Sequence, residues 1–130
     1  MTNKLLLLLT IIASLMLVAC NTPVAVNPKD KPIHTAKYNI NTLTAIVETD
    51  SESAFTATIE ALDNLDYFRT GEKHEDDVIT VFARKVGDIK VVAKIYPINP
   101  EKSEISIRVG YIGNLPDSQT ILSEIQDILI

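Results

Sequence analysis

One cysteine and the residues that precede it are the part of this sequence best suited to chemistry. Cys20 is the only cysteine among 130 residues, which excludes an intrachain disulfide framework and a zinc site built from cysteines. The chain begins with a positive charge at Lys4, followed by an apolar run over residues 5–17 that only Thr10 and Ser14 interrupt. A positive charge followed by an apolar run predicts a targeting segment, and this one ends close to the thiol.

The residues Leu17, Val18, Ala19 and Cys20 resemble the lipobox of bacterial lipoproteins. In that motif a leucine, a small or branched residue, and alanine or glycine precede an obligatory cysteine. Diacylglycerol transfer needs a thiol at the membrane surface, and the peptidase then needs a small residue before the modified cysteine. The resemblance implies that residues 1–19 are a signal peptide and that lipidated Cys20 becomes the new N-terminus.

Three other interpretations of the leader fit less well, and one of them, a buried core helix, is a poor match for a terminal leucine run behind a lysine. An ordinary secretory signal is cleaved after a small-x-small pattern, and Leu17 is large for the first small position. A transmembrane anchor needs about 20 apolar residues. The run over residues 5–20 is shorter than that, so a lipid anchor fits the leader better.

The lipid also predicts where the protein is held. One acyl chain gives only reversible membrane binding, whereas the two or three chains of a lipoprotein cysteine give a stable anchor. Asn21 follows Cys20, and in enteric bacteria an aspartate at that position tends to retain a lipoprotein in the inner membrane. We therefore expect the periplasmic side of the outer membrane, with the inner membrane as the alternative because the sorting rule differs between bacteria.

The segment 20–37 has the composition of a flexible tether. It contains Pro23, Pro28 and Pro32 among polar residues, and no apolar period runs through it. Proline removes a backbone donor and biases its neighbour to extended conformations. We expect the folded part, residues 38–130, to stand off the bilayer on this tether.

The remaining chemistry-bearing residues give weak signals. The segment 72–77 holds Glu72, His74, Glu75 and two aspartates, but it lacks the ligand order of a calcium loop and fits a solvated turn better than a metal site. His34 lies in the tether, and no nucleophile–base motif or phosphate-binding glycine loop is present in the sequence. A net charge of −5 argues against a nucleic-acid partner. We therefore predict no enzyme activity, no cofactor and no metal.

Hydrophobic periodicity predicts the elements of the folded part. Apolar residues alternate over residues 42–48, 89–96 and 105–111, which indicates strands. Residues 78–85 are rich in branched side chains and are also predicted as a strand, and residues 66–69 as a short one. Helical spacing covers residues 51–65 and the segment from Pro116 to the end of the chain. Residues 71–77 and 86–88 read as turns. The order β-α-β-β-β-β-α predicts an α+β domain, an antiparallel sheet with both helices packed on one face.

The other face of that sheet is predicted to carry polar side chains. We expect this wet face to hold Lys90, Val92, Lys94, Tyr96 and Arg108. One interpretation is a surface for a partner such as an acidic peptide, a glycan or another envelope protein. The other is a solvated face whose charges also resist edge pairing.

Residues 42–129 resemble a family of small bacterial lipoproteins catalogued as a domain of unknown function. The resemblance is carried by Leu43-Thr44-Ala45, by Asp50 before Ala54-Phe55, by Ala61-Leu62, by residues 105–110, by Gly113 and by residues 118–125. Asn114 stands where that family has an acidic residue. The resemblance implies the lipoprotein and α+β interpretation and no particular activity. We expect a non-enzymatic interaction or structural module, the alternatives being an accessory lipoprotein of a secretion or assembly machine and an envelope enzyme with an unrecognised site.

Overall fold

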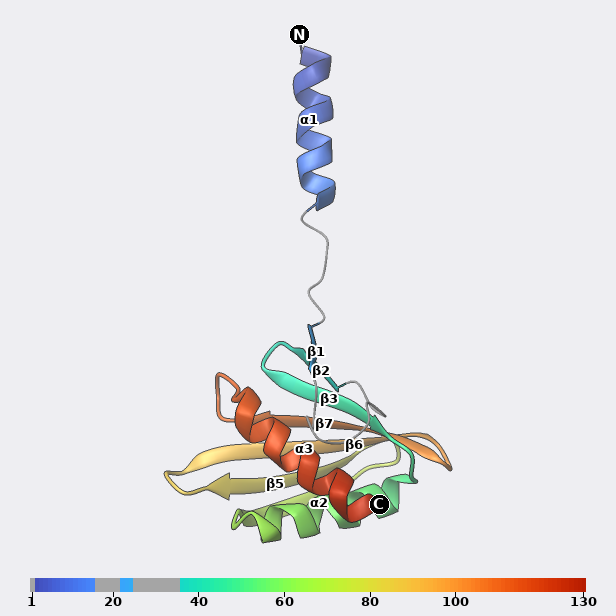
Figure 1. Ribbon diagram of the computed structural model, residues 1–130, viewed down its shortest axis with the longest axis vertical. Coiled ribbons are helices and arrows are strands. Elements are labelled where there is room, and N and C mark those ends of the chain that lie inside the picture. The colour runs from blue at the N-terminus through green and yellow to red at the C-terminus, as the bar shows by residue number, and fades with distance from the viewer. Residues whose placement is uncertain (1, 16–21, 25–35) are drawn as a thin grey trace.

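The computed structural model describes residues 2–15, 22–24 and 36–130, and within these it contains three helices and seven strands (Figure 1). The elements are α1 (Thr2–Leu15), β1 (Thr22–Val24), β2 (Ala36–Asn39), β3 (Thr42–Val47), α2 (Ser51–Asn64), β4 (Phe68–His74), β5 (Ile79–Lys85), β6 (Ile89–Asn99), β7 (Lys102–Val109) and α3 (Leu115–Leu129).

The strands form one antiparallel sheet in the order β1-β2-β3-β7-β6-β5-β4. The central strand β7 pairs with β3 on one side, Ile107 opposite Leu43, and with β6 on the other, Ile107 opposite Ala93. Successive side chains of a strand point to opposite faces, so this register places the apolar alternation of all three strands on the same face.

Both α2 and α3 cover that apolar face (Figure 1). Fully buried side chains of the sheet, such as Leu43, Ile95 and Ile107, meet Leu62 of α2 and Ile121 of α3 in one core. The predicted α+β class, with an antiparallel sheet and two helices on one face, is confirmed.

Helix α2 begins where its sequence provides a cap. The Asp50 carboxylate accepts a hydrogen bond from the backbone N–H of Ser53 at 2.8 Å and a second from the Ser53 hydroxyl. These two bonds favour the ionised form and lower the pKa of Asp50. Asn114 caps α3 in the same way, accepting from the backbone N–H of Asp117 at 3.0 Å.

The structure adds three elements to the predicted order: α1 before the sheet, and the strands β1 and β2. Strand β1 and the first residues of β2 fall within the segment 20–37 that composition predicts as a tether. Both are short, and β1 contains Pro23, which is tolerated in a sheet because β1 is an edge strand. Residues 25–35 lie outside the described part of the chain, so the tether stays a prediction.

Two local expectations were wrong. The polar turn predicted over residues 71–77 begins later, because β4 continues to His74 after a register shift between Arg69 and Gly71. Tyr111, predicted as part of the last strand, lies beyond it: β7 ends at Val109, and Gly110 turns the chain away from the sheet with a φ of 74°.

The turn between β2 and β3 holds an unusual residue. Its two central residues, Ile40 and Asn41, have φ values of 47° and 64°. Positive φ at both positions is the geometry of a primed hairpin turn, which favours asparagine and glycine and disfavours a β-branched side chain. The Ile40 side chain is 83% exposed, so no burial offsets this cost.

We therefore expect Ile40→Asn to raise the free energy of unfolding by about 1 kcal/mol, because asparagine adopts the left-handed conformation at lower cost. Urea denaturation measures the change. The Ile40→Val variant keeps the β-branch and is expected to leave stability unchanged. A loss of stability in Ile40→Asn would show that the isoleucine contributes to folding.

Candidate functional site

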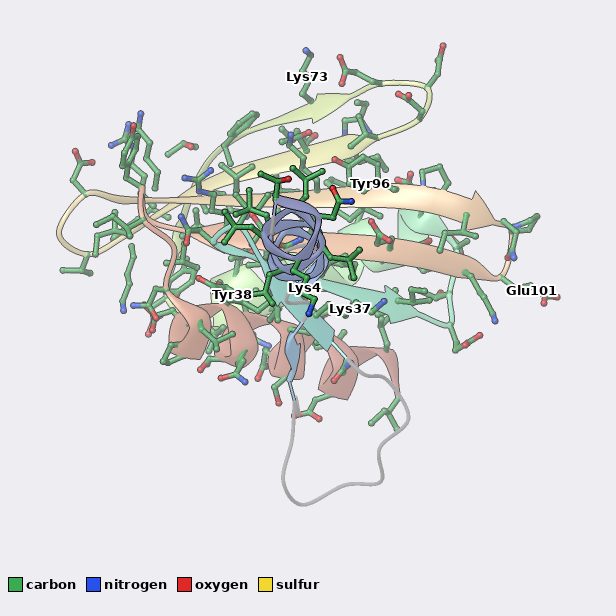
Figure 2. All side chains as sticks on the ribbon, turned by 90° about the horizontal axis from the view of Figure 1, so that it is seen from above. Lys4, Lys37, Tyr38, Lys73, Tyr96 and Glu101 are labelled. Carbon is green, nitrogen blue, oxygen red and sulfur yellow. The ribbon has the colours of Figure 1, made fainter. Side chains whose placement is uncertain are left out.

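The face of the sheet opposite the helices, here called the open face, carries all five residues predicted for the partner surface. Lys90, Lys94 and Arg108 are exposed on it, and Val92 and Tyr96 are half-buried. Figure 2 shows Tyr96 on the side of the sheet that faces away from α3. The predicted orientation of these side chains is therefore correct.

Strand pairing decides which of these residues are neighbours. Val92 lies between Phe82 of β5 and Arg108 of β7, and Phe82 remains 39% exposed. Lys94 lies opposite Ser106, and Tyr96 lies opposite Glu104. The centre of the open face is thus an apolar pair flanked by cationic side chains.

The cations on this face differ in how far they are already engaged. The Arg84 guanidinium, beside Lys90 in the register, contacts the Asp88 carboxylate, and the Arg108 guanidinium donates a hydrogen bond to the backbone carbonyl of Tyr111. Lys90 and Lys94 form no ion pair with another described residue. These two ammonium groups are available to an anionic partner.

The acidic segment 72–77 does not converge on one point. Glu72 and Lys73 point to opposite faces of β4, and Lys73 pairs with Glu75 at 2.9 Å. His74 has its ring 4.9 Å from that of Phe55 in an edge-on contact, with Nε2 3.4 Å from a Glu72 carboxylate oxygen. Within the described residues, no group of three or more His, Cys, Asp or Glu side chains is placed to hold a metal ion.

A hollow of about 350 Å³ lies beside β4, lined by Ile59, Arg69, Thr70, Gly71 and Glu72. The Arg69 guanidinium is committed to Asp63, with Nε 2.8 Å from the carboxylate, and this hydrogen bond raises the pKa of Arg69. The lining offers no nucleophile paired with a base, which is the arrangement that nucleophilic catalysis needs.

A second surface, not predicted from the sequence, is formed where three connections meet at one end of the sheet. We call it the loop end: residues 40–41 between β2 and β3, 86–88 between β5 and β6, and 110–113 after β7. It exposes large apolar side chains, namely Ile40, Val86, Tyr111 and Ile112. A signal was present in the sequence, because each connection sets an apolar residue beside a turn-forming Asn or Gly.

An ion pair and a half-buried phenol lie next to the loop end. Lys85 Nζ is 2.7 Å from the Asp117 carboxylate, and this hydrogen bond raises the pKa of Lys85. Burial, followed by the negative charge of Asp117, raises the pKa of Tyr67. Lys85 and Asp117 are thus neutralised by each other and add no net charge to this end of the sheet.

The predicted lipidation motif, Leu17 to Cys20, and His34 lie outside the described residues. Helix α1 precedes the motif, and its leucines Leu5 to Leu9 are between 61% and 70% exposed. Figure 1 shows α1 standing apart from the sheet. Among the helices that the structure describes, none combines the length and the apolar character needed to cross a membrane.

These features define a small α+β protein with one antiparallel sheet, two helices on one face and a basic open face on the other. The chain belongs to the family described as "Protein of unknown function (DUF3568)", whose profile matches residues 3–128. The match covers the leader as well as the folded domain. A search of curated proteins finds none that matches this sequence.

Proposed function

We propose that this chain is a lipoprotein of the bacterial cell envelope, anchored through acyl chains on Cys20, whose folded domain binds a protein partner without catalysing a reaction. The single observation that carries the proposal is the pairing of a lone cysteine at the end of an apolar leader with a sheet that the described helices α2 and α3 cover on one face.

The leader supports the anchor. Helix α1 exposes a continuous set of leucines and is drawn apart from the sheet (Figure 1), so the domain does not bury its apolar surface. A lone helix of exposed leucines is costly in water and favourable in a membrane. Removal of residues 1–19 after acylation of Cys20 would leave the domain on the periplasmic face of the inner membrane, and transfer from there would bring it to the periplasmic side of the outer membrane, which is the expected place.

The open face supports a protein partner. Phe82 and Val92 form an apolar centre beside Lys90 and Lys94, which make no ion pair with a described residue. Protein interfaces combine an apolar centre with a charged rim in this way. The overall charge of −5 makes this basic patch a local feature. It fits an acidic surface of another envelope protein, because complementary charge steers association.

Acylation is tested on the full chain expressed in a bacterium fed a labelled fatty acid. We expect the label on the protein, a mature chain that begins at Cys20, and a mass for the N-terminal peptide that includes acyl chains. The Cys20→Ala variant is expected to stay an unlabelled precursor, whereas Cys20→Ala with normal processing, or a native chain without fatty acid, would refute the anchor.

The partner face is tested by cross-linking in intact cells. A photoreactive residue at position 92 is expected to give a cross-linked species, and the double variant Lys90→Glu, Lys94→Glu is expected to lose it. Glu60→Lys, on α2 at the covered face, is a charge reversal away from the open face and is expected to keep it. Equal yields in both charge variants would contradict a basic partner face.

A further inference from the structure

The loop end concentrates apolar side chains that the fold does not bury. Tyr111 is 92% exposed, Ile40 83%, Ile112 78% and Val86 76%. Single exposed apolar residues are ordinary, but several that gather on one surface mark a site of interaction with a protein or a membrane.

The loop after β7 is held to its neighbours on both sides. The backbone N–H of Gly110 donates to the Lys90 carbonyl of β6 at 2.7 Å. A side chain at Gly113 would stand 2.5 Å from Asn41 Cβ, so the loop after β7 packs directly on the turn between β2 and β3. Tyr111 and Ile112 are therefore carried by a loop that is fixed to the sheet at both of its ends.

Folding alone does not account for the residue at position 40. A β-branched side chain in a left-handed turn is unfavourable, and at 83% exposure Ile40 gains little from packing. Strained positions that folding does not require are candidates for function.

Charge separates the two ends of the sheet. The connections at the opposite end, residues 48–50, 75–78 and 100–101, contain Glu48, Asp50, Glu75, Asp76, Asp77 and Glu101. Lys102 pairs with Glu48 and Lys73 with Glu75, which leaves four of these six carboxylates without an ion pair to a described residue. Figure 2 marks this end by Glu101 in the β6–β7 hairpin. The three connections of the loop end contain one acidic residue, Asp88, which the Arg84 guanidinium neutralises. The exposed Asp66, between α2 and β4, lies at the same end, and Lys90 forms no ion pair with a described residue.

Strand direction places the start of β1 at the same end. Thr22 pairs with Tyr38, two residues before Ile40, and β1 runs antiparallel to β2. The chain therefore enters β1 from the side of the loop end. Cys20 precedes Thr22 by two residues, which span about 7 Å even when fully extended.

From these observations we propose that the loop end is a membrane-contact surface, which inserts Ile40, Val86, Tyr111 and Ile112 into the interface of a bilayer that carries anionic headgroups. Aliphatic side chains enter the boundary of headgroups and acyl chains, tyrosine favours the interface, and lysine beside them is attracted to anionic lipids. The strands would then stand upright on the bilayer, with the acidic end pointing away. This orientation rests on the proposed function for the place of the anchor.

The absence of tryptophan makes a direct test possible. The full chain is purified from membranes in detergent and reconstituted into vesicles of phosphatidylcholine and phosphatidylglycerol that contain lipids brominated in their acyl chains. Ile112→Trp places a single fluorophore at the loop end. Ile98→Trp, at a residue 50% exposed near the β6–β7 hairpin, is the matched control at the opposite end.

We expect the emission of Ile112→Trp to shift to shorter wavelength and to lose most of its intensity to the brominated lipids, while Ile98→Trp is unaffected. Vesicles of phosphatidylcholine alone are expected to quench Ile112→Trp less. Quenching of neither variant, or of both equally, would overturn the proposal. Protection of Ile112→Trp from quenching that grows with protein concentration would also overturn the proposal, because a second copy of the chain would then cover the loop end.

The mass of the N-terminal peptide in the same sample separates this proposal from the anchor. Quenching of Ile112→Trp in a chain without acyl groups would refute the anchor and keep the membrane contact. An acylated Cys20 with no quenching of Ile112→Trp would keep the anchor and refute the contact.

Discussion

Replacing Gly113 by alanine is expected to lower the free energy of unfolding by about 2–4 kcal/mol. Gly113 has a φ of 87°, a conformation that a Cβ atom disfavours. That atom would also lie 2.5 Å from Asn41 Cβ, 2.7 Å from the Asn41 carbonyl oxygen and 2.6 Å from the Tyr38 hydroxyl. Backbone cannot rotate aside as a flexible side chain can, so the loop after β7 must move off the β2–β3 turn.

Gly87→Ala is the matched control for this prediction. Gly87 also has a positive φ, 93°, but no atom lies within 4 Å of its added Cβ. We expect Gly87→Ala to lower the free energy of unfolding by about 1–2 kcal/mol, which is the cost of holding an alanine at a positive φ. Urea denaturation of both variants measures the difference, which is the cost of the clash. Equal losses would mean that the loop and the turn do not pack together.

Ile107→Ala is expected to lower the free energy of unfolding by a similar or greater amount, about 2–5 kcal/mol. Ile107 is fully buried on the central strand β7. It lies between Leu43 of β3 on one side and Ala93 of β6 on the other. Truncation removes apolar area from the core and leaves a cavity that the two flanking strands hold open. Thermal or urea unfolding of the purified chain gives the change.

Ile46→Ala serves as its control on the opposite face of the sheet. Ile46 belongs to β3, next to β7, and is 43% exposed on the open face. We expect a loss of about 0.5 kcal/mol or less, as for most surface positions. A loss as large as that of Ile107→Ala would mean that something in the protein covers the open face.

Local pattern was sufficient for most of the fold. The alternation in residues 89–96 and the helical spacing of Ile121, Leu122 and Ile125 each report which side of an element meets the core, and the structure buries those sides. The same logic failed for Tyr111, which continues the alternation of β7 in sequence but follows Gly110, where the chain leaves the sheet. Strand β1 was missed because three residues with a proline carry no period.

The open face could be predicted from the sequence, whereas the loop end could not. Lys90, Lys94 and Arg108 were predicted together because alternation within a strand fixes the face of each side chain. The loop end was not predicted, since Ile40, Val86 and Ile112 come together only through the strand order. That order sets β3 beside β7, an arrangement between distant segments that no local pattern encodes.

The placement of β7 at the centre of the sheet also governs when the domain can form. Strands β3 and β6 belong to one sheet only after β7, residues Lys102–Val109, enters between them and pairs with both, and α3 follows later still. A growing chain that has reached Asn99 holds two separate sets of strands and half of its helical cover. Contacts between distant segments form slowly because the intervening chain must be closed first. Such late closure fits the export that we propose above, in which the chain crosses a membrane before it folds.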